Sequence, residues 1–502
     1  MPASPSTARA INDRLALSLL QQQGPLTAGQ LKQLTGLSRP TVADLVERLA
    51  ASGLIAVVGE SGEQRRGPNA RLYGIVADRA HLAALDVRTD SVSVLVSDLV
   101  GRVLAEGTVP VGPEEGTTAA VEQAVALVER TVKEAEASGG GRLHTVGIGA
   151  PGLIDPATCE LRDSAGLPAW HRRLVAALQE RFPEARVSVE NETNLAALAE
   201  QREGVARDRD TFVLLWLGDG CGAAVVLDGS LRRGASGGTG EIGFLPVPGT
   251  EALPSATDCS GGYHSLVGAA AITRLAEQCG LPPSETAAQA VAQATRTTPD
   301  PPAPLETTGT PAEPRRGAGN GAAGHDAPAA DDGLSRPRLE ADGGSAEPRR
   351  GAENGAAGHD APAADDGLSR PRLEADGGSA EPRRGAGDGV AGHDVAAVGR
   401  RAASGPSGDR SGRFLDALAD RIAVGVAAVV AVLDPGCVVL GGEIGPAGGA
   451  VLAERVEARL RLMSPLATEV RASTLGGAAV LRGALLTARE RAQDDLFAPP
   501  GR

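Results

Sequence analysis

The sequence predicts an α/β protein that begins with a winged helix-turn-helix and carries a long disordered insertion in its larger domain. Three observations support this prediction: short helical patterns followed by a basic hairpin, alternating strand-like and helix-like segments, and a stretch without globular patterning. The 502 residues leave room for two to four domains. The predicted boundaries are 1–77 for the winged helix, 80–288 and 412–492 for the two pieces of the α/β domain, and 289–411 for the insertion.

The composition narrows the classes of protein that fit this chain. Hydrophobic residues make up 42% of it and aromatic residues only 2%, so its cores must consist of Ala, Val, Leu and Ile. There is no apolar run of about 18 residues and no signal-peptide pattern, and the five cysteines form no CxxC pair. We therefore expect a cytoplasmic protein with reduced thiols and no membrane contact.

Three helices are predicted before residue 53. Apolar residues at positions 11, 15, 19 and 20 recur at helical spacing and predict a helix over Ile11–Gln22. Thr27 and Ser38 can cap helices over Ala28–Thr35, with Leu31 and Leu34 facing inward, and over Arg39–Ser52. The glycine turn between these two helices is typical of a helix-turn-helix. The third helix has a predicted buried stripe, formed by Val42, Leu45, Val46 and Leu49.

A basic hairpin follows the third helix. Leu54–Val58 and Leu72–Ile75 are predicted as its strands, with Arg65, Arg66 and Arg71 in or beside the loop between them. Residues 1–80 hold nine Lys/Arg against six Asp/Glu, in a chain whose net charge is −14. A mildly basic module on an acidic protein favours a polyanion as partner, and the order of elements indicates double-stranded DNA.

Both parts of this module contain predicted DNA contacts. Ser38, Arg39 and Thr41, at the start of the third helix, are expected to approach base edges or phosphates, and Arg48 lies on the same unburied side. Arg65, Arg66 and Arg71 are expected to lie on phosphates or in a minor groove. The alternative is a three-helix packing unit with a solvated face.

Glycine-rich turns between strands and helices predict the α/β domain. His81–Leu104 alternates like a half-buried hairpin, and helices are expected over Ala119–Ser138 and Phe414–Leu433. Further strand and turn segments follow in order at residues 146–155, 187–200, 211–229, 234–247, 429–445 and 473–488.

Residues 289–411 contain an internal repeat with a period of 34 residues, which begins at Ala312, Ala346 and Ala380. The segment is rich in Gly and Pro and has no amphipathic stripe, which argues against a helical solenoid. Apolar burial there cannot offset about 1–2 kcal/mol of backbone entropy per residue, so we predict disorder. Duplication accounts for the recurring His325, His359 and His393 without metal binding.

These segments resemble the ROK family of repressors and sugar kinases, which has the two-lobed actin-like ATPase fold. The resemblance covers residues 1–288 and 412–490 and rests on five glycine-rich motifs in the family's order. The winged helix, with Gly67-Pro68 in its loop, resembles the repressor branch of that family.

Three loops depart from the pattern of the family's kinases. Those kinases have Asp-x-Gly-Gly-Thr where this chain has Asp86-Val87-Arg88-Thr89-Asp90, and Gly-Thr-Gly-x-Gly-Gly where it has residues 218–223, with Asp219 in place of Thr. Their catalytic Asp corresponds to Glu192, within Glu190-Asn191-Glu192-Thr193-Asn194. Phosphoryl transfer depends on such positioning loops, so we expect no catalytic residue, no ATP and no other cofactor.

The family's zinc and sugar sites are altered as well. Its zinc-binding His corresponds to Phe244, and only Cys259 remains nearby, so we expect no metal. The resemblance implies that a small molecule, a sugar above all, binds in a cleft lined by Asn191, Glu192, Glu241, Phe244 and His264. A phosphosugar or non-sugar effector stays open, as does a structural role for Asn191 and Glu241 in their turns.

The sequence therefore predicts a sequence-specific DNA-binding transcription regulator, with repression as the expected sign. It would bind an operator as a homodimer or homotetramer and respond to a small-molecule effector. One rival is an active sugar kinase with an accessory DNA-binding domain. The other is a scaffold with a closed, ligand-free cleft.

Overall fold

A computed structural model of the chain describes residues 5–61, 69–112, 116–162, 168–250, 252–255, 260–298 and 407–497. The predicted wing residues Arg65 and Arg66, Cys259, and the repeats with their three histidines lie outside the described residues. Among the residues that are described, no helix has the length and apolar character needed to cross a membrane.

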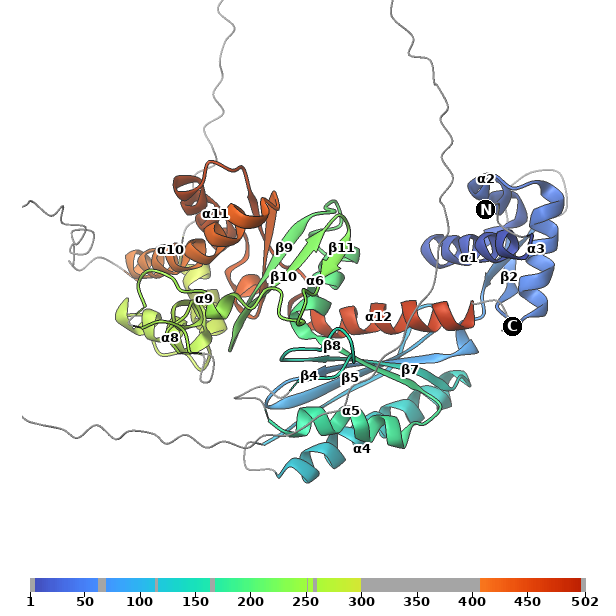
Figure 1. Cartoon of the computed structure of the whole chain (residues 1–502), viewed down its shortest axis with the longest axis horizontal. Coiled ribbons are helices and arrows are strands. Elements are labelled where there is room, and N and C mark those ends of the chain that lie inside the picture. Colours follow the sequence, from blue (N-terminus) through green and yellow to red (C-terminus); the bar gives the residue numbers. More distant parts are fainter. Residues whose placement is uncertain are drawn as a thin grey trace, which may run out of the picture. The chain divides into compact units, whose positions relative to one another are not determined.

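The N-terminal module has the predicted order of helices and strands (Figure 1). Its elements are α1 (Pro5–Gln23), β1 (Leu26–Thr27), α2 (Ala28–Thr35), α3 (Arg39–Ala51), β2 (Ile55–Ser61) and β3 (Ala70–Ile75). The three strands form an antiparallel sheet in the order β1-β3-β2. Thr27 caps α2 in a capping box with Gln30, and Gly36 ends that helix in a left-handed conformation with φ 69°.

The core of this module differs from the predicted one on two helices. The stripe of Val42, Leu45, Val46 and Leu49 on α3 is buried as expected. On α1, however, Ile11 and Leu15 are 59% and 41% exposed, and on α2 Leu34 is 45% exposed. The buried side of α1 is formed by Ala16, Leu17 and Leu20. Of the four apolar residues at helical spacing, Leu20 is buried and Leu19 packs beside it, whereas Ile11 and Leu15 are exposed; the small Ala16 carried no signal in the hydropathy pattern.

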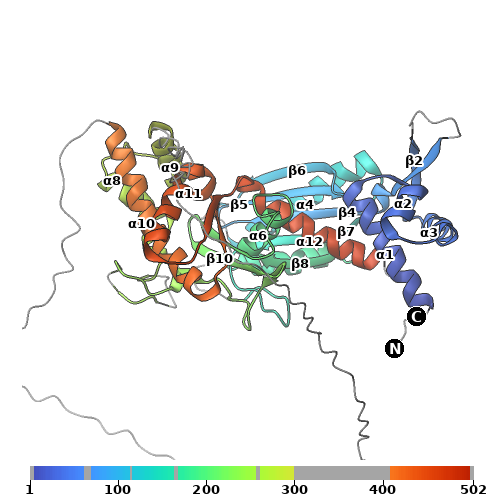
Figure 2. The ribbon, with the colours of Figure 1, turned by 90° about the horizontal axis from the view of Figure 1, so that it is seen from above.

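The first lobe of the larger domain is a five-stranded sheet with helices on both faces (Figures 1 and 2). A short 3-10 helix, Ala77–Arg79, leads into it. Its strands follow the order β6-β5-β4-β7-β8, with β4, β7 and β8 parallel to one another. Leu85 faces α4 and α5, whereas its neighbour Ala84 packs against Val480 of α12 on the other face. The elements are β4 (His81–Val87), β5 (Ser91–Asp98), β6 (Val103–Pro110), α4 (Thr117–Gly139), β7 (Leu143–Ala150), α5 (Trp170–Arg181), β8 (Arg186–Asn191) and α12 (Ala479–Leu496).

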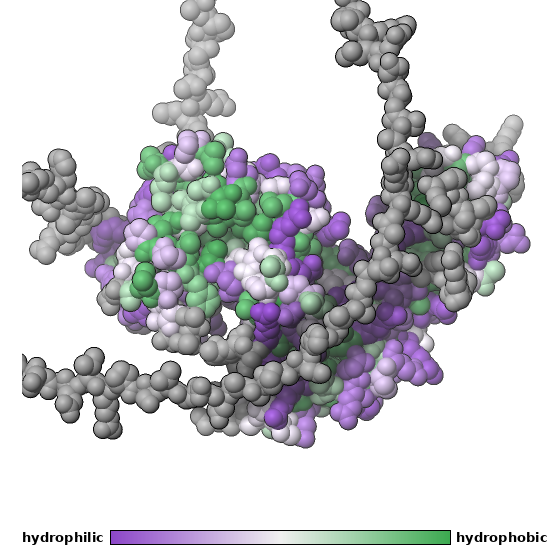
Figure 3. Space-filling model, in the orientation of Figure 1, coloured by the Kyte–Doolittle hydropathy of each residue, from purple (hydrophilic) through white to green (hydrophobic). Residues whose placement is uncertain are grey.

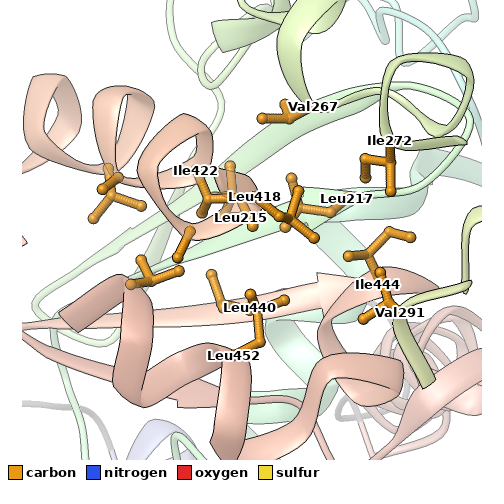
Figure 4. Packing of buried hydrophobic residues seen from close by; sticks show 14 of the residues in the cluster. Leu215, Leu217, Val267, Ile272, Val291, Leu418, Ile422, Leu440, Ile444 and Leu452 are labelled. Atoms are coloured by element: carbon orange, nitrogen blue, oxygen red, sulfur yellow. The ribbon is translucent and has the colours of Figure 1, made fainter. Parts of the chain in front are cut away.

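The second lobe has a sheet in the order β11-β10-β9-β12-β13, with most of its helices on one face. Figure 4 shows that face, where Leu215, Leu217 and Leu440 of the strands pack against helix residues such as Leu418 and Leu452. Helix α6 packs on the opposite face. The elements are α6 (Glu192–Arg202), β9 (Phe212–Leu217), β10 (Cys221–Leu227), β11 (Ser230–Arg232), η2 (Ile242–Phe244), α7 (His264–Val267), α8 (Ala269–Gln278), α9 (Ala287–Thr297), α10 (Ser407–Leu433), β12 (Cys437–Gly442), α11 (Ile444–Met463), β13 (Glu469–Ala472) and η3 (Gly476–Ala478).

The folded part of the chain extends into the predicted insertion 289–411. Helix α9 continues to Thr297, nine residues past the predicted edge at 288, and α10 begins at Ser407. The buried side of α9 consists of Ala287, Ala290, Val291 and Ala294. Three of these four residues are alanines, so composition alone could not distinguish this helix from the Ala-rich insertion.

Helix α12 lies in direct contact with three parts of the molecule. A Cβ on Gly483 would stand 2.0 Å from the carbonyl oxygen of Leu195 in α6, so α12 approaches α6 at a distance that only glycine permits. Further along, Ala488 and Ala492 share a core with α1 of the winged helix. Gln493 Nε2 donates a hydrogen bond of 3.0 Å to Gln21 Oε1 of α1. One rigid helix therefore contacts the first lobe, α6 and the N-terminal module.

Candidate functional site

The N-terminus of α3 is the most open polar surface among the predicted DNA contacts. Ser38 Oγ accepts a hydrogen bond from the Thr41 amide at 3.3 Å and lies 2.7 Å from Thr41 Oγ1, so the two hydroxyls cap the helix together. Arg39 is exposed and, within the described part of the chain, has no hydrogen bond or ion pair. A free guanidinium at a helix N-terminus suits a phosphate or the edge of a guanine.

Arg48 and Arg71 have different surroundings. Arg48 donates to both carboxylate oxygens of Asp13, at 3.0 and 2.5 Å, and to Asp44 at 2.6 Å. These bonds tie α3 to α1, so most of the guanidinium's hydrogen-bonding capacity is used inside the module. Arg71 is exposed on β3, opposite Glu60 of β2. Of these two residues, only Arg71 remains open to an external anion.

Asn191 has a structural role in its turn. Its Oδ1 accepts hydrogen bonds from the amides of Thr193 and Asn194, at 2.9 and 3.2 Å, and so caps α6. Its Nδ2 donates to Gly152 O at 3.2 Å and to Glu192 Oε2 at 2.8 Å. Both ends of the amide are therefore engaged within the protein, which favours the structural alternative for this residue.

Glu192 is the predicted cleft residue with the most perturbed environment. Its pKa is raised to about 8, mainly by burial and also by the nearby Glu241 and Asp86 carboxylates, while Arg88 opposes the rise. Near neutral pH most of this side chain is protonated, so it can donate a hydrogen bond as well as accept one. That combination matches the hydroxyl groups of a polyol.

The loop of Glu241 and Phe244 lies against β10, next to His264. The Ala223 amide donates to Gly240 O at 2.7 Å, which fixes the start of the loop. His264 Cβ lies 3.7 Å from the position that a Cβ would take on Gly243, and burial lowers the pKa of this histidine. Desolvation raises the pKa of the Glu241 carboxyl. Glu241 thus acts electrostatically on Glu192, and His264 lies beside Gly243 in the loop of Glu241, where Phe244 is half-buried.

Sequence reasoning missed two charged residues near this region. Arg233 donates to Glu190 Oε2 at 2.7 Å, and the second oxygen of Glu190 accepts a bond of 3.0 Å from Asn194. Glu443, directly after β12, accepts a hydrogen bond of 2.5 Å from Arg88 Nη1. The glycine motif of residues 441–442 was a signal for a turn there, but nothing in the sequence indicated the partner of Glu443.

The loops that correspond to the family's phosphate loops do not fit a nucleotide. Arg88 lies between two carboxylates, with its Nε 3.1 Å from buried Asp86 and its Nη1 on Glu443. A Cβ on Gly218 would stand 2.2 Å from Glu443 Oε2, so this carboxylate reaches the second loop. A phosphate on Arg88 would have to displace the Glu443 carboxylate, which already binds that guanidinium.

A zinc ion does not fit the residues present either. Phe244, in the position of the family's His, offers no ligand atom. Within the described ranges, no group of three or more His, Cys, Asp or Glu side chains could hold a metal ion.

Fold and site together define a winged-helix module joined to a two-lobed α/β domain in which Glu443 binds Arg88. Residues 82–298 match the ROK family, and residues 11–67 match the MarR family. The chain carries a ROK-family domain behind a MarR-type winged helix. A solved ROK family transcriptional regulator, a homolog of the E. coli MLC protein, superposes with a TM-score of 0.62 over 98% of both chains. At 16% sequence identity, that likeness concerns the fold.

Two relatives in the same comparisons are regulators by name. The Xylose repressor of Caldicellulosiruptor bescii is 27% identical over 239 residues, which are 48% of this chain and 59% of the relative. The DNA-binding transcriptional dual regulator NagC of Escherichia coli is 26% identical over 247 residues, 48% of this chain and 58% of the relative. The matches thus span less than two thirds of the relatives' length.

Proposed function

We propose that this protein is a sequence-specific DNA-binding transcription regulator, with repression as the expected sign, and that a sugar or sugar derivative modulates its operator affinity. The observation that carries this proposal is the exposed start of α3. There Arg39 follows the cap residue Ser38, and its guanidinium is open to solvent. The names of the two relatives support it. The Glu443 carboxylate on Arg88, which a phosphate would have to displace, favours a regulator over a kinase.

Helix α12 offers a route by which the ligand acts on DNA binding. Glu192 is the first residue of α6, α6 packs on α12 at Gly483, and α12 packs on α1 near Ala488. A ligand that shifts α6 would move α12 and, through it, the winged helix. Such coupling is typically worth ~1–3 kcal/mol, or roughly 5–150-fold in affinity.

A DNA-binding experiment tests the proposal directly. Genomic fragments captured by the full-length protein would supply the operator for gel-shift titrations of wild type and Arg39→Ala. We expect the variant to lose roughly 10–100-fold in affinity, as for an arginine that contacts a base or a phosphate. Arg142→Ala, which removes an 88% exposed charge from the first lobe, is the control and should bind like wild type.

The same titration on Arg65→Ala/Arg66→Ala tests the predicted wing. Unchanged affinity in both this variant and Arg39→Ala would contradict the assignment of the module. For the kinase rival, an ADP-release assay over a panel of sugars is decisive. Turnover that disappears in Glu192→Gln would overturn the proposal.

A homo-oligomer fits the need to bind a palindromic operator. Figure 3 shows hydrophobic surface on the lobe that carries α10 and α11, and Val432 and Leu462 near the ends of those helices are 81% and 83% exposed. Self-association through this apolar surface would cover them. The double variant Val432→Glu/Leu462→Glu should shift the sedimentation coefficient toward that of the monomer. We expect the protein to be cytoplasmic.

A further inference from the structure

Arg88 and Glu443 connect the two lobes through a hydrogen-bonded ion pair. Arg88 follows β4 of the first lobe and Glu443 follows β12 of the second, 355 positions later in the chain. Their side chains are 33% and 38% exposed, so the pair is partly shielded from water. An ion pair between a guanidinium and a carboxylate in such a setting favours the arrangement of the lobes in which the two groups meet.

The Arg88 end of this pair is held from several sides. The Arg88 amide donates to Ser91 O at 2.9 Å, and its side chain also binds the buried Asp86. The Arg88 carbonyl oxygen lies 3.2 Å from Nε2 of His171, which is 2% exposed. The His171 ring in turn meets Trp170 edge-on, with 4.3 Å between ring centroids. Arg88 is therefore fixed on its own lobe before it reaches Glu443.

The Glu443 end depends on Gly218. The Glu443 carboxylate occupies the place that a side chain at 218 would need, since a Cβ there would stand 2.2 Å from Glu443 Oε2. The same Cβ position lies 3.2 Å from the indole nitrogen of Trp216. Of the two tryptophans of the chain, Trp170 thus packs on His171 beside Arg88, and Trp216 lies near Gly218 beside Glu443.

We propose that the Arg88–Glu443 pair is a latch that holds the two lobes of this ROK domain together in the place where a kinase of this fold would hold nucleotide phosphates. The latch lies near the predicted ligand region, because Asp86 of β4 and Glu190 of β8 are both in register with Gly149 of the strand between them. A ligand that hydrogen-bonds to Glu192 changes the field at Arg88 and so the strength of the latch. This last link to ligand and DNA rests on the proposed function, whereas the latch itself does not.

Amide hydrogen exchange of the full-length protein tests the latch without any ligand. The reporting amides are Arg88, which donates to Ser91 O, and Gly218, which donates to Gly220 O at 3.0 Å. In Arg88→Gln and in Glu443→Gln, we expect both to exchange about two- to fivefold faster, the factor that corresponds to a partly exposed ion pair. Arg88→Lys, which keeps the charge, should retain part of the protection.

Two further variants test whether the effects come from the Arg88–Glu443 pair or only from the loss of the Arg88 side chain within its own lobe. Gly218→Ala changes no charge, but its Cβ would push the flexible end of Glu443 aside, so it should speed exchange like Glu443→Gln. In Arg88→Gln/Glu443→Gln, the effects should not add, because both substitutions remove one shared interaction. The matched control is Arg209→Gln, which breaks a 2.6 Å pair with Glu469 of similar exposure within one lobe.

Acrylamide quenching of Trp216 in a Trp170→Phe background gives a second measurement. Quenching should rise in Arg88→Gln, Glu443→Gln and Gly218→Ala and stay unchanged in Arg209→Gln. Unchanged exchange and quenching, or fully additive single effects, would overturn the latch. A wild-type protein that binds no genomic DNA but shows these changes would refute the proposed function and leave the latch standing.

Discussion

The N-terminus of α3 and the predicted ligand cleft of the ROK domain are both polar, but their side chains differ in how many hydrogen bonds they make within the protein. At the start of α3, hydrogen bonds link residues three apart in sequence, and Arg39 is left open to solvent. In the cleft, Asn191, Glu190 and Arg88 are each engaged by at least two groups of the protein itself. The start of α3 can therefore bind a partner directly, whereas the polar groups of the predicted cleft already bond to one another.

This difference suggests where each region takes its specificity. A free surface can bind an extended polyanion without rearrangement, so its affinity depends on single side chains. A closed network can bind a ligand only by exchanging internal partners for external ones, which couples binding to shape. We expect substitutions at α3 to change DNA affinity alone and substitutions in the cleft to change stability and coupling together.

The largest expected effect concerns protonation of Glu192. Its pKa of about 8 lies above the ordinary value of 4.5, so its contribution to stability is fully present below pH 4.5 and is lost as pH rises through 8. Relative to Glu192→Gln, wild type should lose on the order of 3 kcal/mol between pH 5 and pH 8. Chemical denaturation over this range measures the difference, and Glu160→Gln, on an exposed site, is the control. Parallel pH profiles of wild type and Glu192→Gln would show that the carboxyl is not perturbed.

Next in size is Gly483→Ala, which strains the helix that contacts both regions. Alanine normally stabilises a helix relative to glycine, but here its Cβ would meet the Leu195 carbonyl at 2.0 Å. We expect a net loss of about 2 kcal/mol in the free energy of unfolding and weaker coupling between cleft and DNA. In the control, Gly477→Ala, a Cβ meets nothing within 4 Å. Equal stability of these two variants would argue against close α6–α12 packing.

Arg48→Ala distinguishes an internal arginine from a DNA-contacting one. The side chain is 34% exposed, so solvent weakens its pair with Asp13 and we expect a loss of about 1 kcal/mol on denaturation. Its operator affinity, measured well below the melting temperature, should stay near that of wild type, in contrast to Arg39→Ala. Arg14→Ala, whose pair with Asp494 is more exposed, should change little in either measurement. A large loss of operator affinity in a stably folded Arg48→Ala variant would show that Arg48 contacts DNA.

The smallest effect is expected at the cap of α3. Ser38→Ala removes the acceptor for the Thr41 amide and should cost roughly 0.5–1 kcal/mol. Ser38→Asn keeps a capping acceptor and should restore stability. If Ser38 also contacts DNA through its hydroxyl, both variants should lose operator affinity, whereas a cap without DNA contact would leave Ser38→Asn at wild-type affinity.

The sequence predicted best those regions whose stabilising contacts join residues close together in the chain. Helices α2 and α3, their caps at Thr27 and Ser38 and the buried stripe of α3 were predicted within a residue or two, because each depends on neighbours three or four positions away. The burial of Ala16 on α1 and the existence of α9 were missed. Both depend on alanines whose burial only the surrounding helices decide.

The sequence alone determined the order of elements, the absence of the phosphate-loop glycines near Arg88 and the substitution of Phe244 for a metal-binding His. Only the tertiary structure decided what replaced those features: Glu443 as the partner of Arg88, Asp13 as the partner of Arg48, and α12 as the contact between cleft and winged helix. The physical reason is chain separation. A cap or a turn is closed by neighbouring residues, whereas a pair 355 positions apart exists only once two lobes have folded and packed.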